Sequence, residues 1–141
     1  MSVYTDSELE FLQVKGRLGR LGTIGPDGGP QLRPVSFRVD PATGAIDVPG
    51  RRNPDTQKWR NAGRRPQVSF VVDDTGDGPG WSPRVVEVRG VAELLPDEHP
   101  ADLFPGVGPG VIRIHPRRIL SHVDGTENNR SVPSAGQPLR A

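Results

Sequence analysis

The chain has 141 residues, no cysteine and a formal net charge of +1. This length suits one domain, and the lack of cysteine excludes disulfides, thiolate metal ligands and a cysteine nucleophile. The near balance of 18 basic and 17 acidic residues argues against general nucleic-acid binding. The sequence contains no run of about 18 apolar residues, so it predicts no membrane-spanning helix. We expect a cytoplasmic protein without a secretory signal.

Short apolar runs alternate with turns rich in Gly and Pro along the chain. We expect helices over 6–15 and 55–61, with a further helical turn over 101–104. Strands are expected over 17–24, 31–39, 45–48, 67–72, 85–95, 111–114 and 118–123. No strand–helix–strand alternation occurs. The pattern therefore predicts a mostly β fold, an antiparallel split β-barrel of six to seven strands with two or three short helices.

The sequence also predicts a helix cap, the faces of one strand and the extent of the barrel. The first helix is expected to be capped by Asp6 or Ser7. If the strand over 31–39 is regular, Arg33 and Arg38 point to opposite faces of the sheet. Residues 1–124 are assigned to the barrel, and the polar residues 125–141 are expected to form a flexible tail.

Few side chains suggest catalysis or metal binding. The three histidines, His99, His115 and His122, lack the spacing of a zinc site. The chain contains neither a nucleophile elbow nor a phosphate-binding P-loop nor a dinucleotide fingerprint. We therefore expect no metal site, and the sequence identifies no catalytic residue.

The most distinctive feature is a basic segment, residues 51–65, with six basic residues and one acid, Asp55. A strand is expected to end there and a helix to begin near Thr56. A helix N-terminus offers N–H groups to an anion, and Thr56 and Lys58 add a hydroxyl and a positive charge. A phosphate site and a solvated helix capped by Asp55 are equally compatible with this spacing.

Three stretches of the sequence, in this order, resemble one known family. They are Leu21–Phe37, Gly50–Asn61 continuing into Arg65–Asp73, and Val86–Glu93 with Ile112–Ile119. Together they resemble the pyridoxamine 5′-phosphate oxidase-like superfamily of split β-barrels, over about residues 6 to 123. The chain is most similar to the branch that uses the deazaflavin coenzyme F420.

The resemblance implies a homodimer with two cofactor sites at the subunit interface. Thr56 and Lys58 match two residues that hold the cofactor phosphate in the family, and Gln57 stands where an arginine is common. Arg33 and Arg38 match the basic residues of the flavin-binding strand. The backbone stretch that lines the cofactor corresponds to Val48, Pro49, Gly50 and Arg51, although Pro49 has no N–H to donate.

By this resemblance, the expected function is an F420-dependent oxidoreductase that reduces a small conjugated molecule. Hydride transfer belongs to the cofactor, which suits a chain without evident catalytic residues. FMN in place of F420, or a cofactor-binding protein without turnover, are the alternatives. A small barrel that binds single-stranded nucleic acid is disfavoured, because Trp59 is the one aromatic residue near the basic segment.

Overall fold

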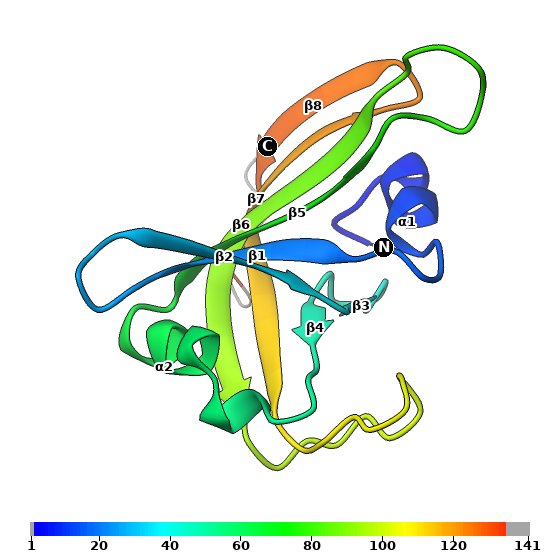
Figure 1. Ribbon diagram of the computed structural model, residues 1–141. Helices are drawn as coiled ribbons and strands as arrows, with labels where there is room; N and C mark the ends of the chain where they lie inside the picture. The colour runs from blue at the N-terminus through cyan, green and yellow to red at the C-terminus, as the bar shows by residue number, and fades with distance from the viewer. Residues whose placement is uncertain (1, 135–141) are drawn as a thin grey trace.

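The computed structural model describes residues 2–134, which form one curled antiparallel sheet and two short α-helices (Figure 1). The elements are α1 (Asp6–Leu12), β1 (Gly19–Ile24), β2 (Pro30–Val35), β3 (Arg38–Val39), β4 (Ile46–Val48), the 3-10 turn η1 (Asn53–Asp55), α2 (Gln57–Arg64), β5 (Gln67–Asp74), β6 (Arg84–Leu95), β7 (Val111–Val123) and β8 (Thr126–Ser131). The predicted fold class is confirmed, with eight strands in the described residues rather than six or seven.

The sheet has the strand order β2-β1-β5-β6-β7-β4-β3, and β8 pairs with β7 beside this path. Figure 1 shows β6 and β7 running through the length of the molecule, with α2 near one end and α1 near the other. β6 is continuous, as the sequence predicts, and has a register shift between Arg89 and Gly90. Glycine is required there, because a Cβ would lie 2.3 Å from the carbonyl oxygen of His115.

The core lies on the inner face of the curled sheet, where alternate residues of the strands are buried. Val68, Phe70 and Val72 of β5 alternate with exposed or half-buried neighbours, as the sequence predicts. The ring of Phe37 packs edge-on against Phe70 with centroids 5.0 Å apart. This contact ties the chain between β2 and β3 to the centre of the sheet.

The first helix is shorter than predicted and is capped by a different residue. Thr5, rather than Asp6 or Ser7, caps α1 through a reciprocal capping box with Glu8. The helix ends at Leu12 instead of residue 15. Glu8 is buried, and its carboxylate accepts hydrogen bonds from Arg130 and Ser121, so that α1 is fixed to β7 and β8.

The predicted strand over 31–39 is wrong as one element. It divides into β2 and β3, and Ser36 and Phe37 lie between them outside the ladder. Alternating hydrophobicity continues through the break, because Val35 and Val39 are buried and Phe37 is half-buried. Arg33 and Arg38 therefore belong to different strands, and their relative direction does not follow from the pleat of a single strand.

The C-terminal part of the fold also differs from the prediction. The two short strands expected over 111–114 and 118–123 are one strand, β7. The expected flexible tail is wrong for residues 126–131, which form β8. Asp124 and Gly125, both with positive φ, form the tight turn that joins β7 to β8. Residues 135–141 of the predicted tail lie outside the described residues.

Two further expectations concern helices. The segment over 101–104 forms turns rather than a helix. Within residues 2–134, the helices are all too short or too polar to cross a bilayer.

Candidate functional site

The start of α2 is fixed by hydrogen bonds that follow from its sequence. Asn53, in η1, is fully buried, and its Nδ2 donates to the carbonyl oxygens of Val48, at 2.9 Å, and of Gly110, at 3.0 Å. Thr56 is the N-cap of α2, and its hydroxyl accepts from the N–H of Trp59 at 3.3 Å. The basic segment is thereby held in one position relative to β4 and β7.

A cavity of about 630 Å³ lies between this helix start and the β1–β2 hairpin. Its lining residues are Thr23, Gln31, Leu32, Arg33, Thr56, Gln57 and Lys58. Four of the nine cofactor-binding residues predicted from the sequence, Arg33, Thr56, Gln57 and Lys58, meet here. They come from two segments that are well separated in the chain and that the fold brings together.

The charge of this cavity is positive and uncompensated. Burial lowers the pKa of the Lys58 ammonium below its ordinary value, and repulsion by Arg33 lowers it further. Among the described residues, no ion pair or side-chain hydrogen bond involves Lys58 or Arg33. The N–H groups of Gln57 and Lys58, in the first turn of α2, have no acceptor within the helix. This set of donors fits an anionic group such as a phosphate.

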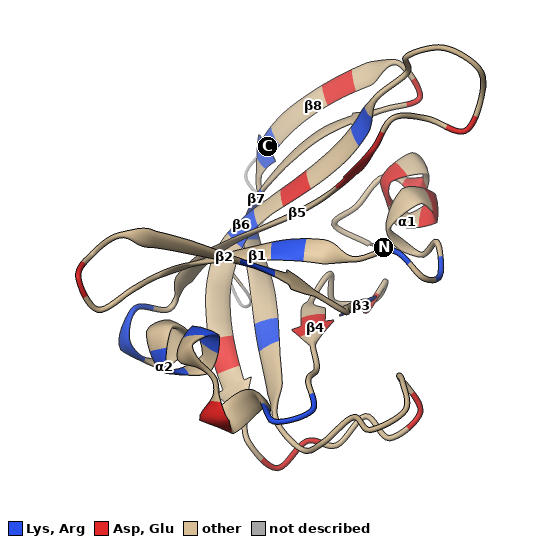
Figure 2. Cartoon of the chain, viewed as in Figure 1, with Lys and Arg blue, Asp and Glu red and all other residues tan. Residues whose placement is uncertain are grey.

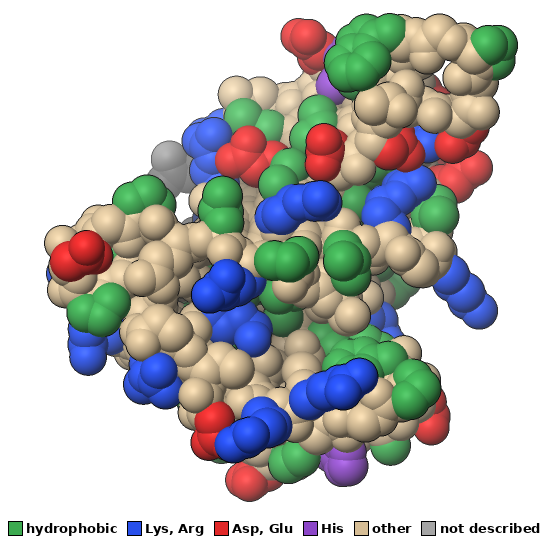
Figure 3. Space-filling view, viewed as in Figure 1, with side chains coloured by type: hydrophobic (Ala, Val, Ile, Leu, Met, Phe, Trp, Pro, Cys, Tyr) green, Lys and Arg blue, Asp and Glu red, His purple; other side chains and the backbone are tan. Residues whose placement is uncertain are grey.

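In Figure 2, Lys and Arg residues mark α2 and the loops beside it. In the space-filling view, basic side chains gather across the middle and lower part of the face, and acidic side chains lie mostly toward its upper end (Figure 3). The acid of the basic segment, Asp55, is engaged by Arg52 at 3.5 Å. It does not line the cavity, so it does not compete with a bound anion there.

Thr56 has a different role from the one that its hydroxyl suggested. Its Oγ1 donates to the carbonyl oxygen of Asn53 at 2.7 Å while it caps the helix. Both functions of the hydroxyl are therefore occupied within the protein. Thr56 contributes to the cavity mainly by fixing the helix start on which Gln57 and Lys58 stand.

The other predicted residues lie elsewhere. Arg38 lines a separate cavity of about 770 Å³, together with Phe37, Leu18 and the chain that follows α1. Val48 and Pro49 are buried, and the carbonyl of Gly50 accepts from the N–H of Gly108 at 2.9 Å. Arg51 is exposed. None of these five residues lines the cavity that contains Lys58, and their predicted contact with a cofactor stays a prediction.

Four residues of the site were not found by the sequence analysis. Thr23 on β1 and Gln31 and Leu32 on β2 line the cavity. Asn61, on α2, donates to Thr23 and Gln31. Their residue types are common in solvated elements, so only their positions could have indicated a role. Gln31 and Leu32 immediately precede Arg33 in the strand, and Asn61 follows Gln57 by one helical turn.

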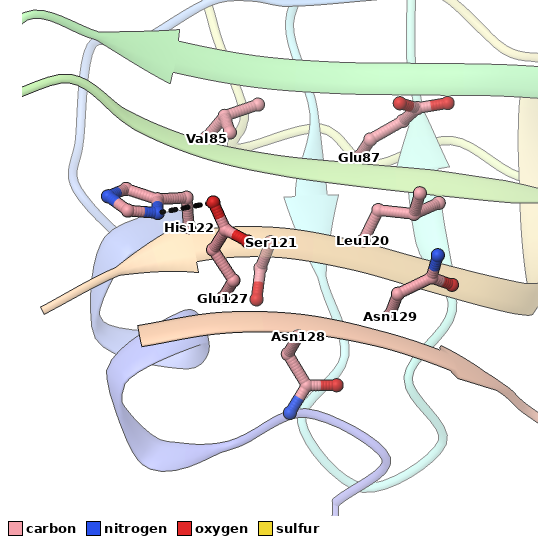
Figure 4. A pocket seen from close by; sticks show the side chains of 8 residues that line it. All are labelled: Val85, Glu87, Leu120, Ser121, His122, Glu127, Asn128 and Asn129. Carbon is pink, nitrogen blue, oxygen red and sulfur yellow. Dashed lines mark ion pairs between the residues drawn. The ribbon is translucent and has the colours of Figure 1, made fainter. Parts of the chain in front are cut away.

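A third hollow, of about 480 Å³, lies over β6, β7 and β8 (Figure 4). Its lining includes Glu87, Glu127 and two asparagines, and His122 Nδ1 lies 3.7 Å from Glu127 Oε1. Acidic side chains disfavour an anion, and the hollow contains no residue of the basic segment. Within residues 2–134, no group of His, Asp and Glu has the arrangement of a metal site.

The curled antiparallel sheet defines a split barrel, and comparison with known proteins identifies the family. The family model of pyridoxamine 5′-phosphate oxidase matches residues 5–120, and the chain belongs to this family. The family prediction made from the sequence is confirmed.

Two relatives are informative about the branch of the family. The chain is 37% identical over 118 residues to the 5a,11a-dehydrotetracycline/5a,11a-dehydrooxytetracycline reductase of Streptomyces rimosus subsp. rimosus, and the match covers 84% of this chain and 82% of the relative. A solved structure named F420 Reductase is 25% identical, with a TM-score of 0.61, and the match covers 83% of this chain and 98% of that one. The predicted activity, a reductase, is matched by the names of both relatives.

A third comparison supports the fold over nearly the whole chain. The crystal structure of a conserved hypothetical protein from Mycobacterium tuberculosis has a TM-score of 0.64 and 27% identity, and the match covers 96% of both chains. The architecture described above is therefore found in a solved protein of nearly the same extent.

Proposed function

We propose that this protein is an F420-dependent reductase that acts on a small conjugated molecule. The observation that carries the proposal is the cavity lined by both Arg33 and Lys58, neither of which has an acidic partner among the described residues. Its anion-binding character suits the phosphate of F420. The relationship to a reductase at 37% identity supports the reaction class, and the relationship to an F420 Reductase supports the cofactor.

In this proposal, two kinds of donor in the cavity hold the cofactor: charged side chains and backbone N–H groups. Arg33 and Lys58 supply charged hydrogen bonds to the phosphate, and the N–H groups of Gln57 and Lys58 supply the helix-start donors. A bound deazaflavin supplies hydride transfer, so the chain has to bind it, orient it and exclude water. This division explains why the sequence contains no evident catalytic side chain.

A second copy of the chain would complete the site, and we propose a homodimer. β2 lies at an edge of the sheet, and its residues from Pro30 to Pro34 are all exposed, with Leu32 at 68%. The outer side of β2 pairs with no other strand of the described sheet, and an exposed apolar side chain on such an edge is unfavourable in an isolated chain. Because Leu32 also lines the cavity, a partner covering β2 would shield the cofactor from water. Sedimentation at micromolar concentration measures this directly.

FMN is the alternative cofactor, because it also carries an anionic phosphate. The two are separated by parallel fluorescence titrations of the apo protein with F420 and with FMN. Preference for F420 supports the proposal, and preference for FMN would assign the protein to the flavin-binding members. If neither binds at micromolar concentration, the cofactor proposal is wrong.

Turnover separates a reductase from a protein that only binds the cofactor. Reduced F420 is followed by its absorbance with a panel of small conjugated acceptors, including 5a,11a-dehydrotetracycline. Acceptor-dependent oxidation of F420 supports the reductase. Tight binding without oxidation by any acceptor would favour a cofactor-binding protein. A cytoplasmic location also remains a prediction.

A further inference from the structure

A chain of side-chain hydrogen bonds runs beneath the proposed phosphate cavity. Arg60 Nη2 donates to Gln57 Oε1 at 2.9 Å, and Gln57 Nε2 donates to Asn61 Oδ1 at 2.7 Å. Asn61 Nδ2 then donates to Gln31 Oε1 at 2.8 Å and to Thr23 Oγ1 at 3.0 Å. Asn61 is 1% exposed and thus connects α2 to β1 and β2 inside the protein.

The direction of this chain is determined at its exposed end. A guanidinium can only donate, so the group of Gln57 that faces Arg60 must be its carbonyl oxygen. The NH₂ group of Gln57 then faces Asn61, which turns the NH₂ group of Asn61 toward Gln31. Each amide fixes the orientation of the next. A reversal at any one link would place two donors or two acceptors against each other.

The last amide of the chain belongs to the cavity wall. The carbonyl oxygen of Gln31 already accepts one hydrogen bond, from Asn61, whereas the two protons on its Nε2 have no acceptor among the described side-chain hydrogen bonds. Gly25 leaves room for this group, because a Cβ there would lie 2.6 Å from Gln31 Nε2. Gln57 likewise keeps one Nε2 proton outside the chain. The two glutamines therefore have free donors, whereas each of their oxygens already accepts one hydrogen bond.

We propose that Arg60 and Asn61 are positioning residues that orient the amides of Gln31 and Gln57 as donors, so that the cavity accepts a phosphoryl group and disfavours a ligand group that must donate. The proposal rests on the proposed function, because it refers to the same cavity. Gln57 thus serves the site as an oriented neutral donor, where an arginine is common in the family. Arg60 acts through Gln57 and need not touch the ligand.

The test compares Arg60→Met with Arg64→Met. Both substitutions remove one exposed positive charge from α2, but among the described residues the Arg64 side chain makes no hydrogen bond to the amide chain. We expect Arg60→Met to weaken F420 binding about three- to tenfold more than Arg64→Met, the scale of one hydrogen bond. Arg60→Lys, which also can only donate, should restore most of this difference. Equal losses in the two Met variants would overturn the proposal.

Two further measurements separate a positioning role from a structural one. With the deazaflavin chromophore that lacks the phosphate, Arg60→Met and Arg64→Met should bind equally; an excess loss in Arg60→Met there would overturn the proposal. In the second measurement, inorganic pyrophosphate is titrated into ¹⁵N-labelled protein and followed by NMR. The side-chain NH₂ signals of Gln31 and Gln57 should shift.

The pyrophosphate titration also distinguishes this proposal from the proposed function. If the wild type fails to bind F420 but pyrophosphate shifts these two signals, the cofactor assignment fails and the oriented donors stand. If F420 binds while neither F420 nor pyrophosphate moves the signals, the oriented donors fail and the cofactor assignment stands.

Discussion

Replacing Lys58 by methionine should have opposite effects on cofactor binding and on the stability of the apo protein. Lys58 is half-buried in the cavity wall and has no acidic partner among the described residues. A charged hydrogen bond from its ammonium to a phosphate contributes about 1.5–3 kcal/mol. We therefore expect Lys58→Met to raise the Kd for F420 roughly 10- to 150-fold.

The effect on stability follows from the lowered pKa of Lys58. Burial and Arg33 disfavour the charged ammonium in the folded chain relative to the unfolded one. A depressed lysine pKa destabilises the fold at neutral pH, and this destabilisation disappears as the pH rises above the unfolded pKa. Methionine keeps the apolar stem without the charge. The Tm of apo Lys58→Met should therefore equal or exceed that of the wild type at neutral pH.

Lys15 provides a matched control, because Lys15 and Lys58 are the two lysines of the chain. Lys15 is exposed and lines the cavity that contains Arg38. Lys15→Met removes the same charge and should leave the Kd for F420 within about twofold of the wild type, as expected for a distant screened charge. Fluorescence titration gives the Kd and a thermal melt gives the Tm. Equal Kd values for the two variants would refute the role of Lys58, and a lower Tm for Lys58→Met would refute the argument from its pKa.

Three substitutions test the framework around the site, each by urea denaturation. Glu8→Gln should cost about 2–3 kcal/mol, because it leaves Arg130 without its carboxylate. Burial raises the pKa of Glu8, but the bonds from Arg130 and its other donors outweigh burial and lower the pKa overall. The wild type should therefore lose stability as the pH falls through this lowered pKa, and a wild type and Glu8→Gln with parallel acid profiles would contradict this. Gly90→Ala should cost about 1–3 kcal/mol through the collision with the carbonyl of His115; an unchanged midpoint would argue against the register shift. Thr56→Ala should lower the stability by about 1 kcal/mol, because the helix cap is lost. It should raise the Kd for F420 less than Lys58→Met does. A larger rise in the Kd for Thr56→Ala would instead indicate that the Thr56 hydroxyl binds the phosphate.

The fold class could be predicted from local patterns because the strands follow them. In β5, for example, Val68, Phe70 and Val72 alternate with less buried residues over the range expected for a strand. The prediction of a flexible C-terminal tail failed for a physical reason. β8 carries no apolar alternation, since it is an outer strand held by its ladder to β7 and by Arg130 rather than by a buried face. A polar strand of this kind looks like a flexible segment in the sequence.

The site was predictable only in part, because it combines residues of β2 with residues at the start of α2, and only the fold brings these two segments together. The basic segment identified Lys58 and its neighbours, since helix-start chemistry is local. Arg33 and Arg38 were expected on opposite faces of one continuous strand. The break at Ser36 and Phe37 assigns them to two cavities, and hydrophobic alternation continues across that break. Nothing in a periodic pattern could have revealed it.

The same features that suit the cavity to an anion weaken the fold in its absence. Two cations line it without an ion-pair partner among the described residues, and β2, which carries one of them, is exposed from Pro30 to Pro34. Each of these costs stability in an isolated apo chain, and an anion or a second subunit offsets it. The buried amide of Asn61, by contrast, has all its hydrogen bonds within the protein. The hydrogen-bonded part of the site is therefore built by the chain itself, whereas its charged part would gain stability only from a bound anion or a second subunit.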